Sequence, residues 1–417
     1  MTKKIILKAP VLTRSGYGEQ SRFALRALRS RPELFDVYIQ PLQWGQTSWI
    51  GDEVEDRQWI DHTIEKTIAY IQQGGHFDAS LQVTIPNEWE SMATVDIGYT
   101  AGMETTKVAP EWIEKGNQVD KIIVVSNHSR DVYKNTEFVA THQQTQEQKI
   151  IKLTTPIETV NYPVKEYEDL PELDLELTPD FNFLVIAQAG PRKNLPNTIK
   201  WFVEEFHNEE VGLVIKANIA KNCLMDRAKL HNDLKGFIAQ YPDRKCKIYL
   251  LHGDMTDEEI HALIKHPKIQ GFFSLTHGEG FGLPLFEAAY SGVPVIVPGW
   301  SGQLDFLVNK ETGLSEFYNV EYDIAPIPEP VVWEGVIIKE SMWAYAREHS
   351  AKQQLRQCYA ALTGDKREET MAKVEAHAEY LKEKFSTEKQ YSEMVAHICD
   401  AIGIDTEVMQ PEVMEID

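Results

Sequence analysis

The feature that most constrains the fold of this chain is a regular alternation of short apolar runs with helical patterns. "KIILKAPVL" (4–12), "FDVYIQPLQW" (35–44) and "KIIVVSN" (121–127) are rich in apolar and β-branched residues, whereas residues 19–31 carry apolar side chains at helical spacing. Strands that alternate with helices in this way form βαβ units, in which the strands are parallel. The first part of the chain is therefore expected to be a doubly wound α/β domain.

A second alternation starts at residue 181 and predicts a second domain of the same class. Its expected strands are the apolar runs at 181–190, 210–218, 246–253, 269–275 and 293–299. Helical patterns lie between them at 197–206, 257–265 and 285–292. A chain of 417 residues is also too long for one ordinary core, which favours two domains.

The segment between the two series, residues 150–180, is rich in proline and acidic residues and lacks a helical period, as is typical of a linker. Past residue 340, the segments 341–362 and 368–385 are expected to be helical throughout. The predicted organisation is an N-terminal Rossmann-like domain (1–165), a linker (166–180), a C-terminal Rossmann-like domain (181–370), helices that pack back on the N-terminal domain (371–405) and an acidic tail (406–417).

Charge and cysteine usage argue against several classes of function. The 42 basic and 64 acidic residues give a net charge of −22, which repels nucleic acid and anionic membranes. No apolar run is long enough to span a membrane and no cleavage pattern follows the first strand, so a cytoplasmic location is expected. The four cysteines have no regular spacing, His261 and His266 lack further ligands, and "DEVED" (52–56) is expected to be a solvated loop, so no metal site is predicted.

The chemistry concentrates in "SLTHGEGFGLPLFEAAYSGVPVIVPG" (274–299). A buried strand ends near Leu275, and Pro284 suits the first turn of the next helix. The loop between them therefore lies at the carboxyl edge of the sheet, where open α/β folds bind ligands. Glycines allow a ligand to approach the backbone closely, and a helix start offers N–H groups to phosphate. The glycines of this loop are Gly278, Gly280 and Gly282.

Two carboxylates, Glu279 and Glu287, lie in the same glycine-rich and otherwise apolar segment. Carboxylates accept hydrogen bonds from hydroxyl groups, so the segment combines a phosphate-binding backbone with groups that bind hydroxyls. This combination describes a site for a nucleotide sugar. The other interpretation is that "GFG" and the apolar face of "LFEAAY" serve core packing. Core packing alone does not explain the two glutamates in this segment.

The Glu-x7-Glu pattern with the intervening "GFGLPLFEA" resembles the signature of retaining GT-B glycosyltransferases of family 4, also called group 1. The resemblance implies a GT-B fold with a central cleft, an N-terminal acceptor domain and a C-terminal donor domain. It also implies transfer of a sugar from a nucleotide sugar with retained configuration and without a metal or other cofactor. Glu279 would contact the transferred sugar and Glu287 the ribose hydroxyls. The donor loop would comprise Gly280, Phe281, Gly282 and Leu283.

Further donor residues follow from the same resemblance. "LTRSGYGEQSRFALRAL" is similar to the N-terminal glycine loop of the family, with Gly16 and Gly18 near the diphosphate. "FNFLVIAQAGPRKNLPNTI" is similar to the start of the donor domain, with Lys193 as the phosphate-binding lysine, although a lysine in such a loop is often only solvated. The loop after "KIYLLHGDM", with His252 and Gly253, would lie against the base.

One position departs from the family pattern. The arginine expected five residues before Lys193 is replaced by Gln188, and a neutral amide does not supply the charge of a guanidinium. Either Arg192 or Lys216 would supply the missing charge, or catalysis would be weakened. Lys216 is favoured because it lies at the end of a strand on the cleft edge. Gln188 also supports an alternative of another class, a non-catalytic protein that binds nucleotide sugars.

The acceptor is less constrained by the sequence. Glu104 and His128 lie where strands of the first domain are expected to end at the cleft, although a structural role is an alternative for each. Trp44 could stack on a sugar, with core packing as its alternative. A glycan or another small hydroxylated molecule is the expected acceptor.

A second acceptor class, 5-hydroxymethylcytosine in DNA, follows from a further resemblance. "TRSGYGEQSRFALRAL" and "VDKIIVVSNHS" are similar to glycosyltransferases encoded by tailed phages. A DNA acceptor would need a local stripe of basic residues, because the net charge of the chain is negative. Alternatively, the same arginines form only the solvated face of a helix. The arginines in question are Arg14, Arg22, Arg26, Arg29 and Arg31.

Overall fold

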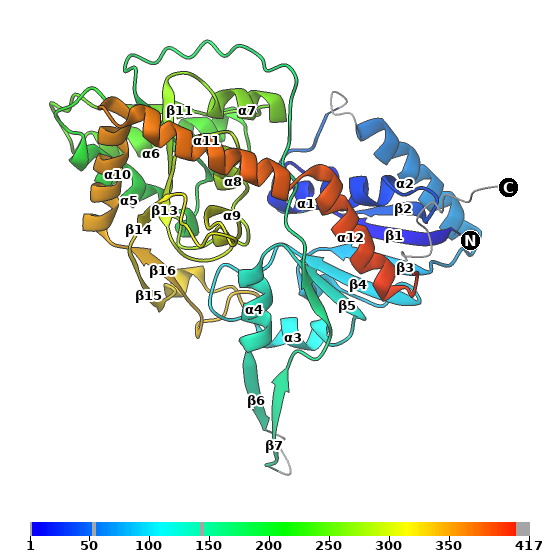
Figure 1. Cartoon of the computed structure of the whole chain (residues 1–417). Helices are drawn as coiled ribbons and strands as arrows, with labels where there is room; N and C mark the ends of the chain where they lie inside the picture. Colours follow the sequence, from blue (N-terminus) through cyan, green and yellow to red (C-terminus); the bar gives the residue numbers. More distant parts are fainter. Residues whose placement is uncertain (1, 52–55, 142–145, 406–417) are drawn as a thin grey trace.

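Two six-stranded sheets organise the molecule, one in each half of the chain (Figure 1). The computed structural model describes residues 2–51, 56–141 and 146–405. All strand pairs within each of these two sheets are parallel. The two doubly wound α/β domains predicted from the sequence are therefore confirmed.

The first sheet has the order β2-β1-β3-β4-β5-β8. Its strands are β1 (Lys3–Ala9), β2 (Phe35–Pro41), β3 (Ala79–Val83), β4 (Val95–Thr100), β5 (Lys121–Val124) and β8 (Ile157–Thr159). The helical elements of this half are α1 (Gly16–Arg29), α2 (Arg57–Gln72), the 3₁₀ helix η1 (Pro86–Glu88), α3 (Pro110–Gly116) and α4 (Asn127–Asn135). Because strands of a parallel sheet are covered on both faces, β1, β3 and β5 consist of almost wholly buried residues.

The second sheet has the order β11-β10-β9-β12-β13-β14. Its strands are β9 (Asn182–Gln188), β10 (Gly212–Asn218), β11 (Lys247–Leu251), β12 (Ile269–Phe273), β13 (Val295–Pro298) and β14 (Tyr318–Val320). Its helical elements are η2 (Pro191–Lys193), α5 (Leu195–Glu205), α6 (Leu224–Ile238), α7 (Asp257–Ile264), α8 (Leu283–Tyr290) and α9 (Leu304–Leu307). The described chain between β8 and β9, which includes the predicted linker 166–180, contains no helix or strand.

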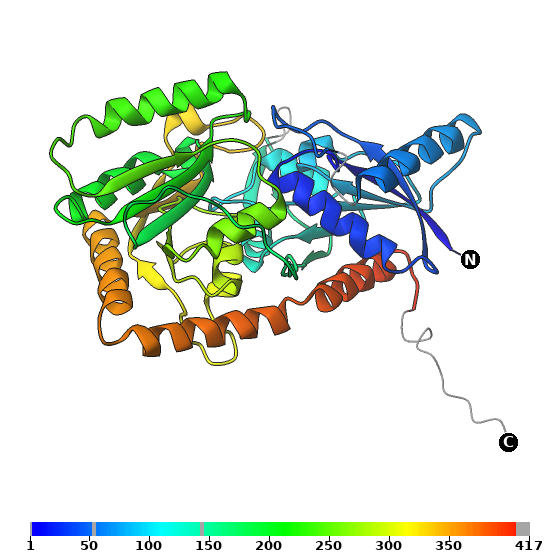
Figure 2. The ribbon, with the colours of Figure 1, turned by 90° about the horizontal axis from the view of Figure 1, so that it is seen from above.

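Three C-terminal helices run along one side of both domains (Figure 2). They are α10 (Glu348–Thr363), α11 (Arg367–Lys384) and α12 (Thr387–Ala401). α10 packs on α5 and α11 packs on α8, both in the second domain, whereas α12 packs on α1 of the first. Near the end of α12, Asp400 forms an ion pair with Lys121 of β5. The predicted tail 406–417 and most of "DEVED" (52–55) lie outside the described residues.

The prediction of continuous helix from residue 341 is wrong at its start. Residues Met342–Ala346 form β16, which pairs antiparallel with β15 (Tyr322–Pro326), and the 3₁₀ helix η3 (Glu329–Val331) lies between them. Trp343 and Ala344 are buried in this arrangement. Strand pairing and burial therefore decide the structure of this segment, although its sequence pattern is also compatible with the start of a helix. The antiparallel hairpin of β6 (Glu137–Thr141) and β7 (Gln148–Lys152), which projects from the first domain in Figure 1, was also not predicted.

Candidate functional site

The glycine loop lies between β12 and α8 and faces the first domain. A Cβ atom on Gly280 would lie 2.2 Å from the carbonyl oxygen of Ala101, and one on Gly278 would lie 2.4 Å from that of Glu104. Both carbonyls follow β4 of the other domain. Gly282, the residue before α8, has a φ of 99°, which favours glycine. Gly278 and Gly280 thus allow the backbones of the two domains to come into contact. The sequence predicts only that these glycines let a ligand approach the backbone.

Strand β16 supports the glycine loop from the side of the second domain. The Ala344 amide donates to the His277 carbonyl at 3.0 Å, and the rings of His277 and Trp343 stack with centroids 4.6 Å apart. Met342, at the start of β16, contacts the first domain: its carbonyl accepts from the Thr106 amide at 2.9 Å. The unpredicted strand therefore joins the loop to both domains.

Glu279 is the centre of a buried charge cluster. Its carboxylate accepts from Arg192 Nη1 at 2.8 Å and from Lys193 Nζ at 2.6 Å. Its backbone N–H donates to Ser301 Oγ at 2.9 Å, which orients the residue. Burial alone would raise the pKa of Glu279, but the adjacent Arg192 and Lys193 lower that pKa to about 2. The carboxylate is therefore ionised at neutral pH, and burial lowers the pKa of Lys193 despite the attraction of Glu279.

Two of the predicted acceptor residues adjoin this cluster. Glu104 Oε1 lies 3.4 Å from Arg192 Nη2, so the first domain contributes a second carboxylate to the same guanidinium. The His128 ring lies edge-on against Trp300 at 5.0 Å, burial lowers the His128 pKa to about 4, and its Nε2 has no hydrogen-bond partner among the described residues. The third, Trp44, packs on Tyr17 with centroids 4.3 Å apart, which agrees with its packing alternative.

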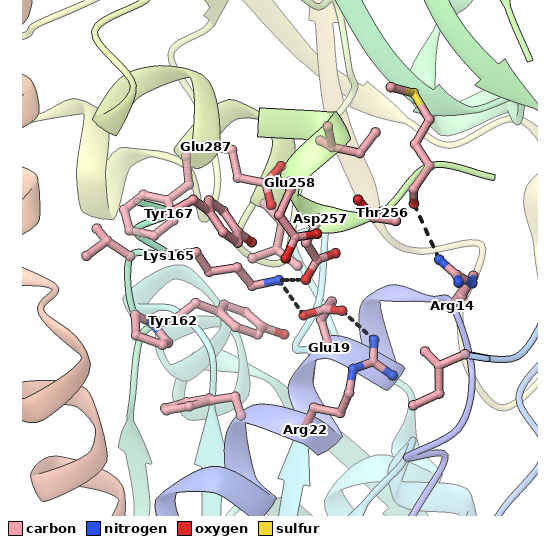
Figure 3. Close-up of a pocket in the computed structure, with 18 of the residues that line it drawn as sticks. Arg14, Glu19, Arg22, Tyr162, Lys165, Tyr167, Thr256, Asp257, Glu258 and Glu287 are labelled. Carbon is pink, nitrogen blue, oxygen red and sulfur yellow. Dashed lines mark hydrogen bonds and ion pairs between the residues drawn. The ribbon is translucent and has the colours of Figure 1, made fainter. Parts of the chain in front are cut away.

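Glu287 lies in a cavity of about 620 Å³ between the domains (Figure 3). α1 and residues 162–167 form one side of the cavity, and residues 253–258 with α8 form the other. Burial raises the pKa of Glu287 to about 7, although the positive charge of Lys165 acts in the opposite direction. The two glutamates of the motif therefore occupy separate environments, since Glu279 does not line this cavity.

Lys165 forms an ion-pair network in the same cavity (Figure 3). Its Nζ lies 2.8 Å from Glu19 Oε2 of α1 and 2.7 Å from Asp257 Oδ2, which opens α7. Glu19 also pairs with Arg22, whose Nη1 donates to the Val11 and Thr13 carbonyls at 3.0 Å. Sequence reasoning missed this network because Lys165, at the predicted boundary between the first domain and the linker, is part of no motif.

The remaining donor residues differ in what their side chains contact. Lys216 lines the cavity, and its ammonium donates to the Gly253 carbonyl. Gln188 is exposed and donates to the Ile219 carbonyl at 3.0 Å. His252 does not line the cavity, because its Nε2 lies 2.9 Å from Asp226 Oδ1. Of the two cations considered as the replacement for the family arginine, Arg192 rather than the favoured Lys216 contacts the carboxylate that binds Lys193.

Phe281 and Leu283, the apolar members of the donor loop, contribute to packing. Phe281 is buried against the Phe286 ring of α8, whereas Leu283 lines the cavity. At the start of α1, a Cβ atom on Gly16 would meet nothing within 4 Å. A Cβ atom on Gly18 would lie 1.9 Å from the Thr13 carbonyl oxygen, and the Gly18 amide donates to Ser15 Oγ at 3.0 Å. The Gly18 amide therefore serves helix capping.

The five arginines considered for DNA binding do not form a free basic stripe. Arg22 is buried, and Arg26 and Arg29 both pair with Asp56 at 2.7 and 2.6 Å. Arg31 pairs with Glu33, and Arg14 donates to the Trp49 and Met255 carbonyls. Asp56 is itself buried, so the expectation of a solvated loop is wrong for this last residue of "DEVED". Within the described ranges, no helix is long and apolar enough for a membrane span, and no cluster of potential metal ligands occurs.

Comparisons with known proteins agree with this architecture. Residues 175–321 match the family model described as glycosyl transferases group 1. A crystal structure of a glycosyltransferase from Rickettsia africae superposes with a TM-score of 0.60 and 14% identity over 96% of this chain and 99% of that one. HepE from Anabaena, in complex with UDP and glucose, superposes with a TM-score of 0.55 and 11% identity over 95% of this chain and 100% of that one.

The chain has the GT-B fold. Residues 175–321 are thus similar to group 1 glycosyl transferases, and the structural neighbours share the fold of the whole chain. A curated relative, the rabbit (Oryctolagus cuniculus) UDP-glucuronosyltransferase 2B13, is 29% identical over 157 residues, which cover 35% of this chain and 28% of that protein. The match thus spans little more than a quarter of the relative.

Proposed function

We propose that this protein is a retaining glycosyltransferase that moves a sugar from a nucleotide sugar to a hydroxyl group of a glycan or another small molecule. The observation that carries the proposal is the contrast within one motif: Glu279 lies between two cations, and Glu287, eight residues on, lies in an adjoining cavity. A nucleotide sugar needs both, since its diphosphate requires positive charge and its ribose requires hydroxyl acceptors. That HepE binds UDP and glucose in the same fold is consistent with such a donor.

In the proposed reaction, the bond between the anomeric carbon and the diphosphate oxygen breaks. The acceptor oxygen bonds to the same face of the sugar, and the acceptor proton passes to an oxygen of the departing diphosphate. Arg192 and Lys193 stabilise the negative charge that develops on the diphosphate. Glu279 holds these cations and contacts the sugar. Arg192 takes the part of the family arginine missing at Gln188, because it lies beside Lys193 whereas Lys216 is bound to Gly253.

In the proposed complex, Arg192 and Lys193 contact the diphosphate as a metal ion otherwise would, so we propose that transfer needs no metal. His128 and Glu104 are the proposed acceptor contacts, since both lie where the first domain meets the glycine loop. A DNA acceptor has less support, because its candidate arginines are bound within the protein.

The decisive experiment incubates the protein with a panel of labelled nucleotide sugars and with glycan, small-molecule and 5-hydroxymethylcytosine DNA acceptors, each with and without EDTA. Mass spectrometry detects the product and NMR assigns its anomeric configuration. We expect a glycan or small-molecule product with the configuration of the donor, formed equally in EDTA. Calorimetric binding of a nucleotide sugar without transfer or hydrolysis would favour a non-catalytic binding protein, and an inverted product would overturn retention.

A further inference from the structure

We propose that Lys165 is a positioning residue that keeps Glu287 able to accept hydrogen bonds from the ribose hydroxyls of the donor. The inference rests on the proposed function, because it assigns a role to a residue in the wall of the same donor site. It adds a determinant of nucleotide affinity that lies in the segment between β8 and β9, outside the motif itself.

The geometry makes Lys165 the meeting point of three parts of the chain. Its ammonium bridges Glu19 of the first domain and Asp257 of the second at 2.8 and 2.7 Å, while its own backbone belongs to the segment that joins them. The Lys165 side chain is 24% exposed, so the charge lies at the cavity wall rather than in bulk solvent. Lys165 and Glu287 line the same cavity (Figure 3).

Two carboxylates already share Lys165, and Glu287 is a third acidic group nearby. Lys165 lowers the pKa of Glu287, whereas Asp257 and Glu19 raise it, and burial exceeds all three effects. Without Lys165, the negative charges of Asp257 and Glu19 would act on Glu287 unopposed by this ammonium. Glu19 would keep Arg22 as a partner.

His261, Tyr167 and Tyr290, which also lie near Glu287, contribute little charge at neutral pH. Burial lowers the pKa of His261 to about 4, which leaves the ring neutral. Burial raises the pKa values of Tyr167 and Tyr290 above their usual range. The groups around Glu287 are Lys165 and Tyr167 from the segment between β8 and β9, Glu19 from α1, Asp257, Glu258 and His261 from α7, and Tyr290 from α8.

An ionised carboxylate accepts hydrogen bonds from two neighbouring hydroxyls, whereas a protonated one carries a donor that competes with them. Because the pKa of Glu287 is about 7, its carboxyl is close to half ionised at neutral pH. An adjacent cation lowers a carboxyl pKa by about one unit or more. Removing the charge of Lys165 therefore reduces the ionised fraction at pH 7 from about one half to about one tenth, and ribose binding weakens about fivefold.

The test is calorimetric titration of the intact protein between pH 6 and pH 9. The ligands are pyrophosphate, which lacks ribose, and whichever of UDP, GDP, ADP and CDP the wild type binds most tightly. Lys165→Met removes the charge, Lys165→Gln removes it while keeping hydrogen-bond donors for Glu19 and Asp257, and Lys165→Arg retains it. Lys268→Met is the matched control, since Lys268 donates to the Leu177 carbonyl at the far end of the linker.

We expect the nucleotide Kd of Lys165→Met and Lys165→Gln, relative to wild type, to rise about ninefold at pH 6 and about fivefold at pH 7, and to approach the wild-type value at pH 9. The pyrophosphate Kd of every variant should stay near the wild-type value at every pH. The nucleotide Kd of Lys165→Arg and Lys268→Met should do the same.

A loss that is independent of pH and equal for pyrophosphate would overturn the inference and indicate only a structural link between the domains. Wild-type affinity in both charge-removing variants would overturn it as well. If the wild type binds none of the four nucleotides, the proposed function fails first and the inference fails with it. Lys165→Gln keeps the test valid if Lys165→Met does not fold.

Discussion

Glu279 and Glu287 belong to one motif, yet their surroundings give them opposite ionisation behaviour. Glu279 has two cations within 2.8 Å, and its pKa is about 2. Glu287 is half-buried, the cation that lowers its pKa, Lys165, is held by two other carboxylates, and the pKa of Glu287 is about 7. The partner that each carboxyl finds, rather than burial, thus decides which one is always charged.

This difference suggests separate tasks for the two ends of the proposed donor site. A permanently ionised Glu279 can hold Arg192 and Lys193 in place at any working pH. Glu287 changes its ionised fraction across neutral pH, so the affinity for ribose should depend on pH. Pairs of carboxyls whose environments separate their pKa values commonly divide roles in this way.

The largest effect is expected from disrupting the Glu279 cluster. Lys193→Ala removes a donor aimed at the leaving diphosphate, and Glu279→Ala leaves both cations without their carboxylate. Each change should reduce transfer about a hundredfold or more while the far-ultraviolet circular dichroism stays unchanged. Initial rates with a labelled donor measure the loss, and Lys200→Ala on the exposed face of α5 is the control. Near-normal turnover in either variant would refute the assignment.

The second prediction concerns the pH dependence of stability. Because the folded-state pKa of Glu287 lies above its ordinary value of 4.5, the native state binds the proton more tightly, and stability decreases as pH rises from about 4.5 to about 7. Glu287→Gln lacks this group, so the free energy of unfolding of the variant should increase relative to wild type across that window, by at most about 3 kcal/mol. Urea unfolding at several pH values measures the difference.

Glu279→Gln should behave in the opposite direction, which sharpens the comparison. The pKa of Glu279 is lowered, so its stabilisation is present above pH 4.5 and is lost as pH falls from about 4.5 towards about 2. Relative to wild type, Glu279→Gln should therefore be less stable at pH 6 and should approach the wild-type stability in acid. Parallel pH profiles for the two variants would contradict the proposed difference between the glutamates.

The sequence predicts the two domains well because parallel strands are buried on both faces and read as uninterrupted apolar runs. It fails at β16, where the segment around Trp343 is a strand only because β15 and the glycine loop lie against it. The β6–β7 hairpin lacks a buried alternation, since most of its residues are exposed. The local sequence pattern therefore predicts strands that are completely buried. It does not predict strands whose formation depends on pairing with a distant segment.

The same limit applies to the site. The spacing of Glu279 and Glu287 identifies the motif, but it contains no information on their protonation. The pKa of Glu279 depends on Arg192 and Lys193, and that of Glu287 depends on burial and on Lys165, more than a hundred residues earlier. Reasoning from strand ends favoured Lys216 as the second cation. That lysine is indeed at a strand end, but the short turn before α5 brings Arg192 closer to Glu279.

A third, smaller effect is expected at the contact between the domains. In Gly280→Ala the new Cβ would clash with the Ala101 carbonyl, and because that carbonyl belongs to the other domain, the strain can be relieved by opening the cleft. We expect a loss of stability of about 1–3 kcal/mol, an increased radius of gyration in X-ray scattering and slower transfer. Gly236→Ala is the matched control: it lies within α6, its Cβ would meet nothing within 4 Å, and the change should stabilise by about 0.5–1 kcal/mol.

The smallest effect is expected at the position that departs from the family pattern. If Arg192 already supplies the second cation, Gln188→Arg adds charge at an exposed strand end and should strengthen pyrophosphate binding by less than about fivefold. Arg192→Gln, in contrast, removes a guanidinium bound directly to Glu279 and should weaken that binding by more than about tenfold. Calorimetry on both variants and on the double variant compares the two positions. A double variant restored to wild-type affinity would mean that either position can serve, whereas a large gain in Gln188→Arg alone would show that Arg192 does not replace the missing arginine.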